Sequence, residues 1–95
     1  MKEDFESEKL VTSYMKLMSH KYNCLYFKLS LRYFSGFPDC LIIKNGKVFF
    51  IELKKTGGKA TRLQECIGRR IKNYGGNWIC LNSKKSIKKF FEDNF

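Results

Sequence analysis

A β-hairpin with charged residues at its open end is the feature that most constrains how this chain can fold. Asn45-Gly46 lies between two apolar runs, and this pair favours a tight type I′ turn because both residues tolerate positive φ. Asp39 precedes the first run, and Glu52 and Lys54 end the second. Side chains two residues apart on a strand share a face, so Glu52 and Lys54 should lie together, with Asp39 folded back towards them.

The residues before the hairpin predict one helix and one strand. Apolar residues recur with helical spacing over about 5–22, which is typical of an amphipathic helix. An alternating pattern follows over 24–31 and predicts a strand with one buried face. The residues expected on that face are Leu25, Phe27, Leu29 and Leu31. The uninterrupted apolar runs of the hairpin should form the centre of the sheet.

The residues after the hairpin predict a helix, a strand and a final helix. The first helix should begin after Thr61, a good N-cap, and end at Gly75-Gly76. Its expected buried stripe is Leu63, Cys66, Ile67, Ile71 and Tyr74. A strand over 77–81 and a helix over about 84–93, with lysines on its outer side, complete the order αβββαβα. We expect one α/β domain spanning residues 1–95.

The charge of the chain indicates a polyanionic partner. Its 19 Lys and Arg against 9 Asp and Glu give a formal net charge of +10, and nucleic acid is the leading candidate. There is no apolar stretch long enough to cross a membrane and no signal peptide, so we expect a cytoplasmic protein without a membrane partner. Four widely spaced cysteines, Cys24, Cys40, Cys66 and Cys80, predict reduced core residues and no zinc site.

The charged end of the hairpin suits metal-dependent phosphodiester hydrolysis. Asp39 and Glu52 are hard oxygen donors of the kind that Mg²⁺ prefers, and the Leu53 carbonyl can complete the protein ligands. A divalent metal can activate water and polarise a phosphate. Lys54 can stabilise the developing charge, or position and deprotonate the attacking water. The bland alternative is that Glu52 and Lys54 are an ordinary charge pair on a strand.

The motif as a whole resembles a known nuclease family. The strings Gly36-Phe37-Pro38-Asp39 and Ile51-Glu52-Leu53-Lys54, followed by Gln64, are similar to the VRR-NUC domain of the PD-(D/E)xK nuclease superfamily. The resemblance covers nearly the whole chain. It implies a restriction-endonuclease-like αβββαβ core, a mixed sheet flanked by helices, with an additional C-terminal helix.

The resemblance also implies roles for single residues. Asp39 and Glu52 would be metal ligands for Mg²⁺ or Mn²⁺, Lys54 the catalytic lysine, and Gln64 the helix residue that positions the lysine or the water. A glutamate of the first helix would join the metal site. Glu8 fits that place best by spacing, and Glu6 is its rival.

For the substrate, the resemblance implies DNA. Small stand-alone domains of this kind are often encoded by phages, in which case the protein would act in the bacterial host cell, and some cut four-way Holliday junctions or other branched DNA as homodimers. Basic residues that flank the motif are expected to bind phosphates: Arg32, Lys55, Lys59, Arg62 and Arg69. The alternative function is a non-catalytic basic nucleic-acid-binding module, for which the net charge alone suffices.

Overall fold

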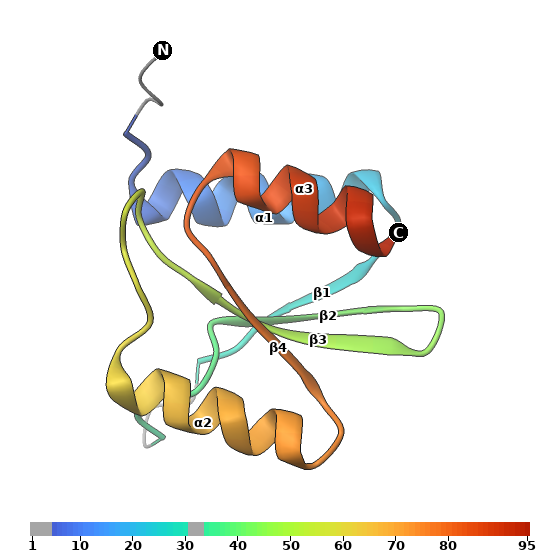
Figure 1. Ribbon diagram of the computed structural model, residues 1–95. Helices are drawn as coiled ribbons and strands as arrows, with labels where there is room; N and C mark the ends of the chain where they lie inside the picture. The colour runs from blue at the N-terminus through green and yellow to red at the C-terminus, as the bar shows by residue number, and fades with distance from the viewer. Residues whose placement is uncertain (1–4, 31–33) are drawn as a thin grey trace.

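The computed structural model describes residues 5–30 and 34–95, so the predicted phosphate contact Arg32 lies outside the described residues. It contains three helices and four strands in the predicted order (Figure 1). The elements are α1 (Glu8–Lys21), β1 (Leu25–Lys28), β2 (Cys40–Lys44), β3 (Lys47–Leu53), α2 (Arg62–Asn73), β4 (Asn77–Leu81) and α3 (Lys84–Asn94). The predicted αβββαβ order with an additional C-terminal helix is confirmed, and it is consistent with a restriction-endonuclease-like core.

The four strands form one mixed sheet in the order β1-β2-β3-β4. The first three are antiparallel neighbours, and β4 joins β3 in parallel. The hairpin strands β2 and β3 are therefore central, as predicted. The turn between them has positive φ at both Asn45 (51°) and Gly46 (78°), which is the backbone of a type I′ turn.

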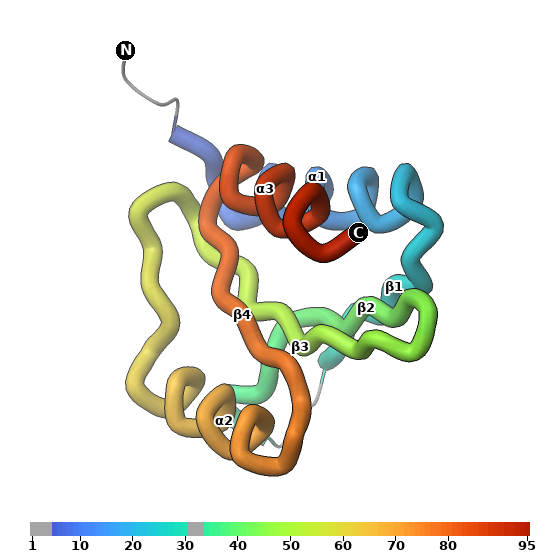
Figure 2. The backbone as a smooth tube through the Cα atoms, turned by 45° about the vertical axis from the view of Figure 1, so that its right-hand side comes forward, coloured from blue at the N-terminus to red at the C-terminus, as the bar shows by residue number. Residues whose placement is uncertain are grey.

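One face of the sheet carries the core. Helices α1 and α3 lie beside each other over this face, and α2 lies against the other (Figures 1 and 2). The core is contiguous and entirely apolar at its centre. Its most buried members are Val11, Met15, Cys40, Ile42, Ile51, Leu53, Ile87 and Phe91. Since α1 and α3 anchor their apolar stripes here, both helices are held firmly on the sheet.

The predicted buried face of β1 is wrong. Leu25 and Phe27 are 54% and 49% exposed, whereas Tyr26, between them, packs against the core. Leu29 is half-buried beyond the end of β1, and Leu31 lies outside the described residues. Both phases of the alternation contain residues that can be buried, and α1 with α3 covers the phase that includes Tyr26. Leu25 and Phe27 therefore point to the side of the sheet on which α2 lies.

The predicted buried stripe of α2 is wrong for three of its five residues, while Ile67 and Ile71 are half-buried. Gly68 is the buried residue of this helix, while Leu63 and Tyr74 are 48% and 89% exposed and Cys66 is an exposed free cysteine. The helix contacts the sheet through Gly68, where an added Cβ would lie 2.4 Å from Trp78 Cδ2. This close approach turns the flank that carries Leu63 and Tyr74 away from the sheet. Of the other cysteines, Cys24 and Cys40 are buried as predicted, and Cys80 is half-buried.

The described helices do not include one that is both long and apolar enough to cross a membrane.

Gly68 provides a test of how α2 is attached. We expect Gly68→Ala to lower the free energy of unfolding by about 1–3 kcal/mol, the usual effect of forcing extra atoms into a packed contact. At an uncrowded helical position the same change stabilises by roughly 1 kcal/mol. Urea unfolding measures the difference. As a control, Gly68→Ala in a Trp78→Leu background should lose most of its penalty; a Gly68→Ala protein as stable as the parent would contradict this packing.

Candidate metal and phosphate site

Asp39 is fixed at the start of β2 by both its backbone and its side chain. Its N–H donates to the carbonyl of Ile51 (3.0 Å), and its carbonyl accepts from the N–H of Leu29 (2.8 Å). Its carboxylate Oδ2 accepts from the N–H of Leu53 (2.8 Å). The predicted return of Asp39 to the end of β3 is therefore present. Because a carboxylate has two oxygens, this hydrogen bond orients the group and leaves Oδ1 for a further ligand.

Glu52 is a buried carboxylate. It is 1% exposed, an unusual state for a glutamate. Its Oε1 accepts a hydrogen bond from Gln64 Nε2 (3.0 Å), while its Oε2 is buried without a hydrogen-bond partner among the described residues. A buried polar oxygen without a partner is costly. Such an oxygen needs either a proton or a cation.

Gln64 reaches Glu52 because it belongs to the capping box of α2. The side chain of Thr61 accepts from Gln64 N (3.2 Å), and Gln64 Oε1 accepts from Thr61 N (2.8 Å). The amide nitrogen of Gln64 is thereby free to donate to Glu52. The role that the resemblance implies for Gln64, positioning the lysine or the water, stays a prediction, and the structure adds a hydrogen bond from its amide to the Glu52 carboxylate.

The surroundings of Glu52 raise its pKa from 4.5 to about 8. Burial is the main cause, because it penalises the charged form. The nearby carboxylates of Asp39 and Glu8 raise the pKa further, while Lys54 lowers it. Without a cation, the site therefore holds a proton on Glu52 at neutral pH.

A cavity of about 450 Å³ opens beside Asp39, and Glu8 lines it together with Asp39 and Leu53. Glu6, the rival of Glu8, is placed elsewhere. Its Oε1 accepts from the N–H of Lys84 (2.8 Å), at the start of α3. Of the two candidate glutamates, the described geometry brings Glu8 towards the carboxylate pair and ties Glu6 to α3.

Lys54 lies directly after β3, where its N–H donates to the carbonyl of Leu81 (3.0 Å). It lines a second cavity, of about 480 Å³, together with the predicted phosphate contacts Lys55 and Lys59. Glu8 borders both cavities. The site thus has an acidic part at Asp39 and Glu52 and a basic part at Lys54, with Glu8 between them.

The remaining predicted contacts lie on α2. Arg62 and Arg69 are exposed there, and no hydrogen bond or ion pair of their side chains is found among the described residues.

The first cavity also includes residues that the sequence reasoning missed. Tyr26 and Lys28 of β1 line it, as do Lys9 and Lys16 of α1. Burial, with Cys40 and Asp39 nearby, raises the pKa of Tyr26 to about 12. The alternating pattern of residues 24–31 is the sequence signal that could have identified Tyr26 and Lys28. Tyr26 and Lys28 fall on the core-facing phase of an edge strand, where a lysine needs an opening to solvent.

The residues present fit a divalent cation held by two carboxylates. Among residues 5–30 and 34–95 there is no group of three or more His, Cys, Asp or Glu side chains arranged to hold a metal by themselves. Mg²⁺, however, usually takes only one or two protein carboxylates and keeps several waters. The unpartnered Oε2 of Glu52 and the oriented carboxylate of Asp39 suit that kind of site.

The raised pKa of Glu52 has a consequence for stability in EDTA. Below about pH 4.5 the carboxyl is protonated in both folded and unfolded chains. Between pH 4.5 and 8 the unfolded chain releases a proton that the folded chain retains, so the free energy of unfolding should fall as pH rises. One pKa unit corresponds to about 1.4 kcal/mol, so the full loss is at most about 5 kcal/mol.

Glu52→Gln tests this, since it keeps an acceptor for Gln64 and removes the titration. Urea unfolding at pH 5, 7 and 9 should show the variant gaining stability relative to the parent as pH rises. Parallel pH profiles for the two proteins would contradict a buried, protonated Glu52.

Comparison with known proteins gives a match among solved structures. No protein-family model matches the chain, and no curated protein matches it. A solved structure described as a "VRR_NUC domain" aligns with a TM-score of 0.84 and 29% sequence identity, covering 93% of this chain and 97% of that one. The chain is thus a structural match to the VRR-NUC domain over nearly its whole length, and the resemblance that its motifs indicated is confirmed.

Proposed function

We propose that this protein is a metal-dependent endonuclease that hydrolyses phosphodiester bonds in DNA. The observation that carries the proposal is Glu52, buried to 1% exposure with one oxygen unpartnered, next to an oriented Asp39 and followed by Lys54. The match to a VRR_NUC domain supports the same chemistry. Perturbed carboxyl groups beside an open cavity are typical of catalytic sites.

Asp39 and Glu52, with the Leu53 carbonyl, would hold the divalent ion, Mg²⁺ or Mn²⁺. When bound, such an ion activates water and polarises the scissile phosphate. Glu8 borders the same space and is the further carboxylate within reach of the site. Gln64 keeps Glu52 aimed by donating to Oε1, which leaves Oε2 for the ion.

Lys54 would act on the phosphate itself. It lies in the basic cavity beside the carboxylates, where an ammonium can stabilise the negative charge that gathers on the phosphoryl oxygens. The same position allows it to orient the attacking water or take its proton.

Phosphates flanking the scissile bond would be bound by the basic residues around the site. Lys55 and Lys59 share the cavity with Lys54. Arg62 and Arg69 of α2 would extend the positive surface, and Arg32 remains a predicted phosphate contact. Contacts of this kind give affinity without sequence preference.

Lys54→Met tests the catalytic proposal, with Lys55→Met as a matched control that removes the same charge one residue away. In Mg²⁺ or Mn²⁺, on labelled linear, flap and four-way DNA, Lys54→Met should cut at least about 100-fold more slowly, the usual scale for loss of such a group. Lys55→Met should mainly weaken binding. EDTA should abolish cleavage.

The non-catalytic nucleic-acid-binding module is the competing function. It predicts that the parent protein binds these DNAs with or without metal and cuts none of them. Cleavage that EDTA or Lys54→Met leaves unchanged would also contradict the proposed site.

We further propose that the enzyme acts as a homodimer on branched DNA such as a four-way junction. The support is an apolar surface on the α2 side of the sheet. The exposed apolar residues there are Leu25 and Phe27 of β1, Leu63 of α2, Tyr74 at the carboxyl end of α2, and Phe34. Between residues 34–37 and α2 there is an open groove of about 350 Å³, lined by Phe34, Phe37 and Ile67. Clusters of exposed apolar side chains can mark protein contacts, and a two-fold dimer presents two cutting centres to a symmetric junction.

Light scattering coupled to size-exclusion chromatography tests the dimer. The parent should elute as a dimer, and Leu25→Thr with Phe27→Thr should elute as a monomer, since threonine keeps the strand but removes the apolar surface. Leu10→Gln with Leu17→Gln, on exposed apolar positions of α1, is the control and should remain dimeric. A monomeric parent, or dissociation in the control alone, would contradict this surface.

A further inference from the structure

Helix α3 carries a one-sided lysine surface that the proposed catalytic site does not use. Its four members are Lys84, Lys85, Lys88 and Lys89, all exposed. Their spacing of one and four residues places them on one side of a helix. The opposite side, with Ile87, Phe90 and Phe91, is buried in the core. The lysines are therefore presented on a firmly packed scaffold rather than on a loose segment.

The charges on this surface are poorly neutralised by the protein. Lys89 pairs with Asp93 (3.7 Å), in an exposed contact of little energetic weight. Lys84 lies over the ring of Tyr14 at 5.8 Å. Within the described ranges, neither Lys85 nor Lys88 takes part in an ion pair.

The position of these lysines is unfavourable for the helix itself. The first turn of α3 contains no acidic residue and begins with Lys84 and Lys85. The amino end of a helix carries a partial positive charge, so cations there are destabilising, whereas an anion bound nearby is favoured. The carboxylate of Glu6, which accepts from Lys84 N, already supplies one negative charge at this end of α3, and an anion bound beside Lys85 and Lys88 would relieve the remaining repulsion.

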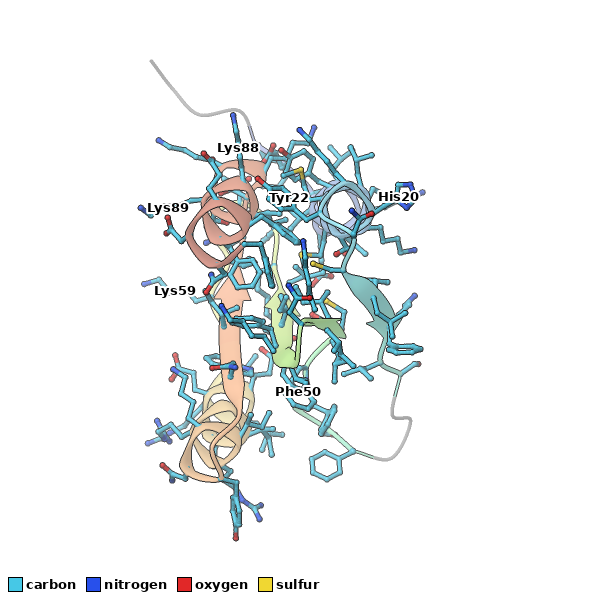
Figure 3. All side chains as sticks on the ribbon, turned by 90° about the vertical axis from the view of Figure 1, so that its right-hand side faces the viewer. His20, Tyr22, Phe50, Lys59, Lys88 and Lys89 are labelled. Carbon is cyan, nitrogen blue, oxygen red and sulfur yellow. The ribbon has the colours of Figure 1, made fainter. Side chains whose placement is uncertain are left out.

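The lysine surface adjoins the basic loop that follows β3, residues 54–60, which contains Lys54, Lys55 and Lys59. Asn82 Nδ2 donates to the carbonyl of Gly58 (2.9 Å), which attaches the loop to the residues preceding α3. Glu6 bridges the same region, because its carboxylate binds Lys84 N and its backbone pairs with Thr56. Figure 3 shows Lys59, Lys88 and Lys89 on the same side of the molecule, with His20 on the opposite side.

From this arrangement we infer that α3 binds the phosphate backbone of a duplex arm adjoining the DNA at the proposed catalytic site. The helix has 11 residues and is therefore about 16 Å long, a length that spans roughly five base-pair steps. Lysines one turn apart are separated by about 6 Å along the axis, which allows successive contacts along one strand. This inference rests on the proposed function, which identifies the nucleic acid as DNA. The inference adds the surface of the protein that binds the duplex arm.

The test compares two variants with the same loss of charge. Lys85→Gln with Lys88→Gln removes two α3 lysines that form no ion pair with the described residues, and Lys21→Gln with Lys47→Gln removes two exposed lysines near the hairpin end of the molecule. Fluorescence anisotropy in EDTA measures binding to a labelled duplex over a range of salt concentrations. The slope of log K against log salt is negative, and each lost phosphate contact should reduce its magnitude by about 0.9.

We expect the magnitude of the slope to fall by about 2 for the α3 pair and by less than half that amount for the control pair. Thermal melting checks that both variants remain folded. Equal slopes for the two variants, an unchanged slope in the α3 pair, or no duplex binding by the parent would overturn the inference.

Cleavage by the parent in Mg²⁺, measured separately, distinguishes this inference from the proposed function. If the parent cuts DNA and the two double variants bind with equal slopes, only the inference about α3 is contradicted. If the parent cuts no DNA and the slopes of the two double variants differ as expected, only the nuclease proposal is contradicted.

Discussion

The hydrogen bond between Gln64 and Glu52 is the contact on which the rest of the site depends. It joins the first turn of α2 to the last residues of β3, elements that meet only because β3 and β4 pair in parallel across that helix. A buried carboxylate without a hydrogen-bond partner would lower the free energy of unfolding substantially. The side-chain amide of Gln64 donates through Nε2 to one oxygen of Glu52, and its Oε1 accepts from Thr61 N in the cap of α2. The second oxygen of Glu52 is left available for a cation.

The two sides of the sheet are used differently. One is closed by α1 and α3 and holds a contiguous apolar core. The other is covered by α2 through the close approach of Gly68 to Trp78, and much of its apolar surface stays open. The candidate site is reached from both sides, because α1 and β1 line the cavity at Asp39 and the first turn of α2 contacts Glu52.

Local sequence signals predicted the centre of this fold well, because their causes are local. Asn45-Gly46 determines its own turn, and Thr61 and Ser83 cap their own helices. The Asp39 and Glu52 pair could also be anticipated, since the hairpin register follows from the turn. The exposure of Leu25 and Leu63 could not, because a hydrophobic pattern shows which residues favour burial but not which neighbour covers them. Nor did the motif reveal the partner of Gln64, which depends on how α2 returns to the sheet.

The junction around Glu6 has a consequence for how the chain acquires its structure. There the carboxylate meets Lys84 across 78 residues of sequence, and the backbone meets Thr56 across 50. Closing such large loops is entropically expensive and slows folding, whereas the hairpin and the helix caps form from near neighbours. We therefore expect the loop that carries Lys54 to reach its final place in one of the last steps of folding, after the sheet that holds the two carboxylates has formed.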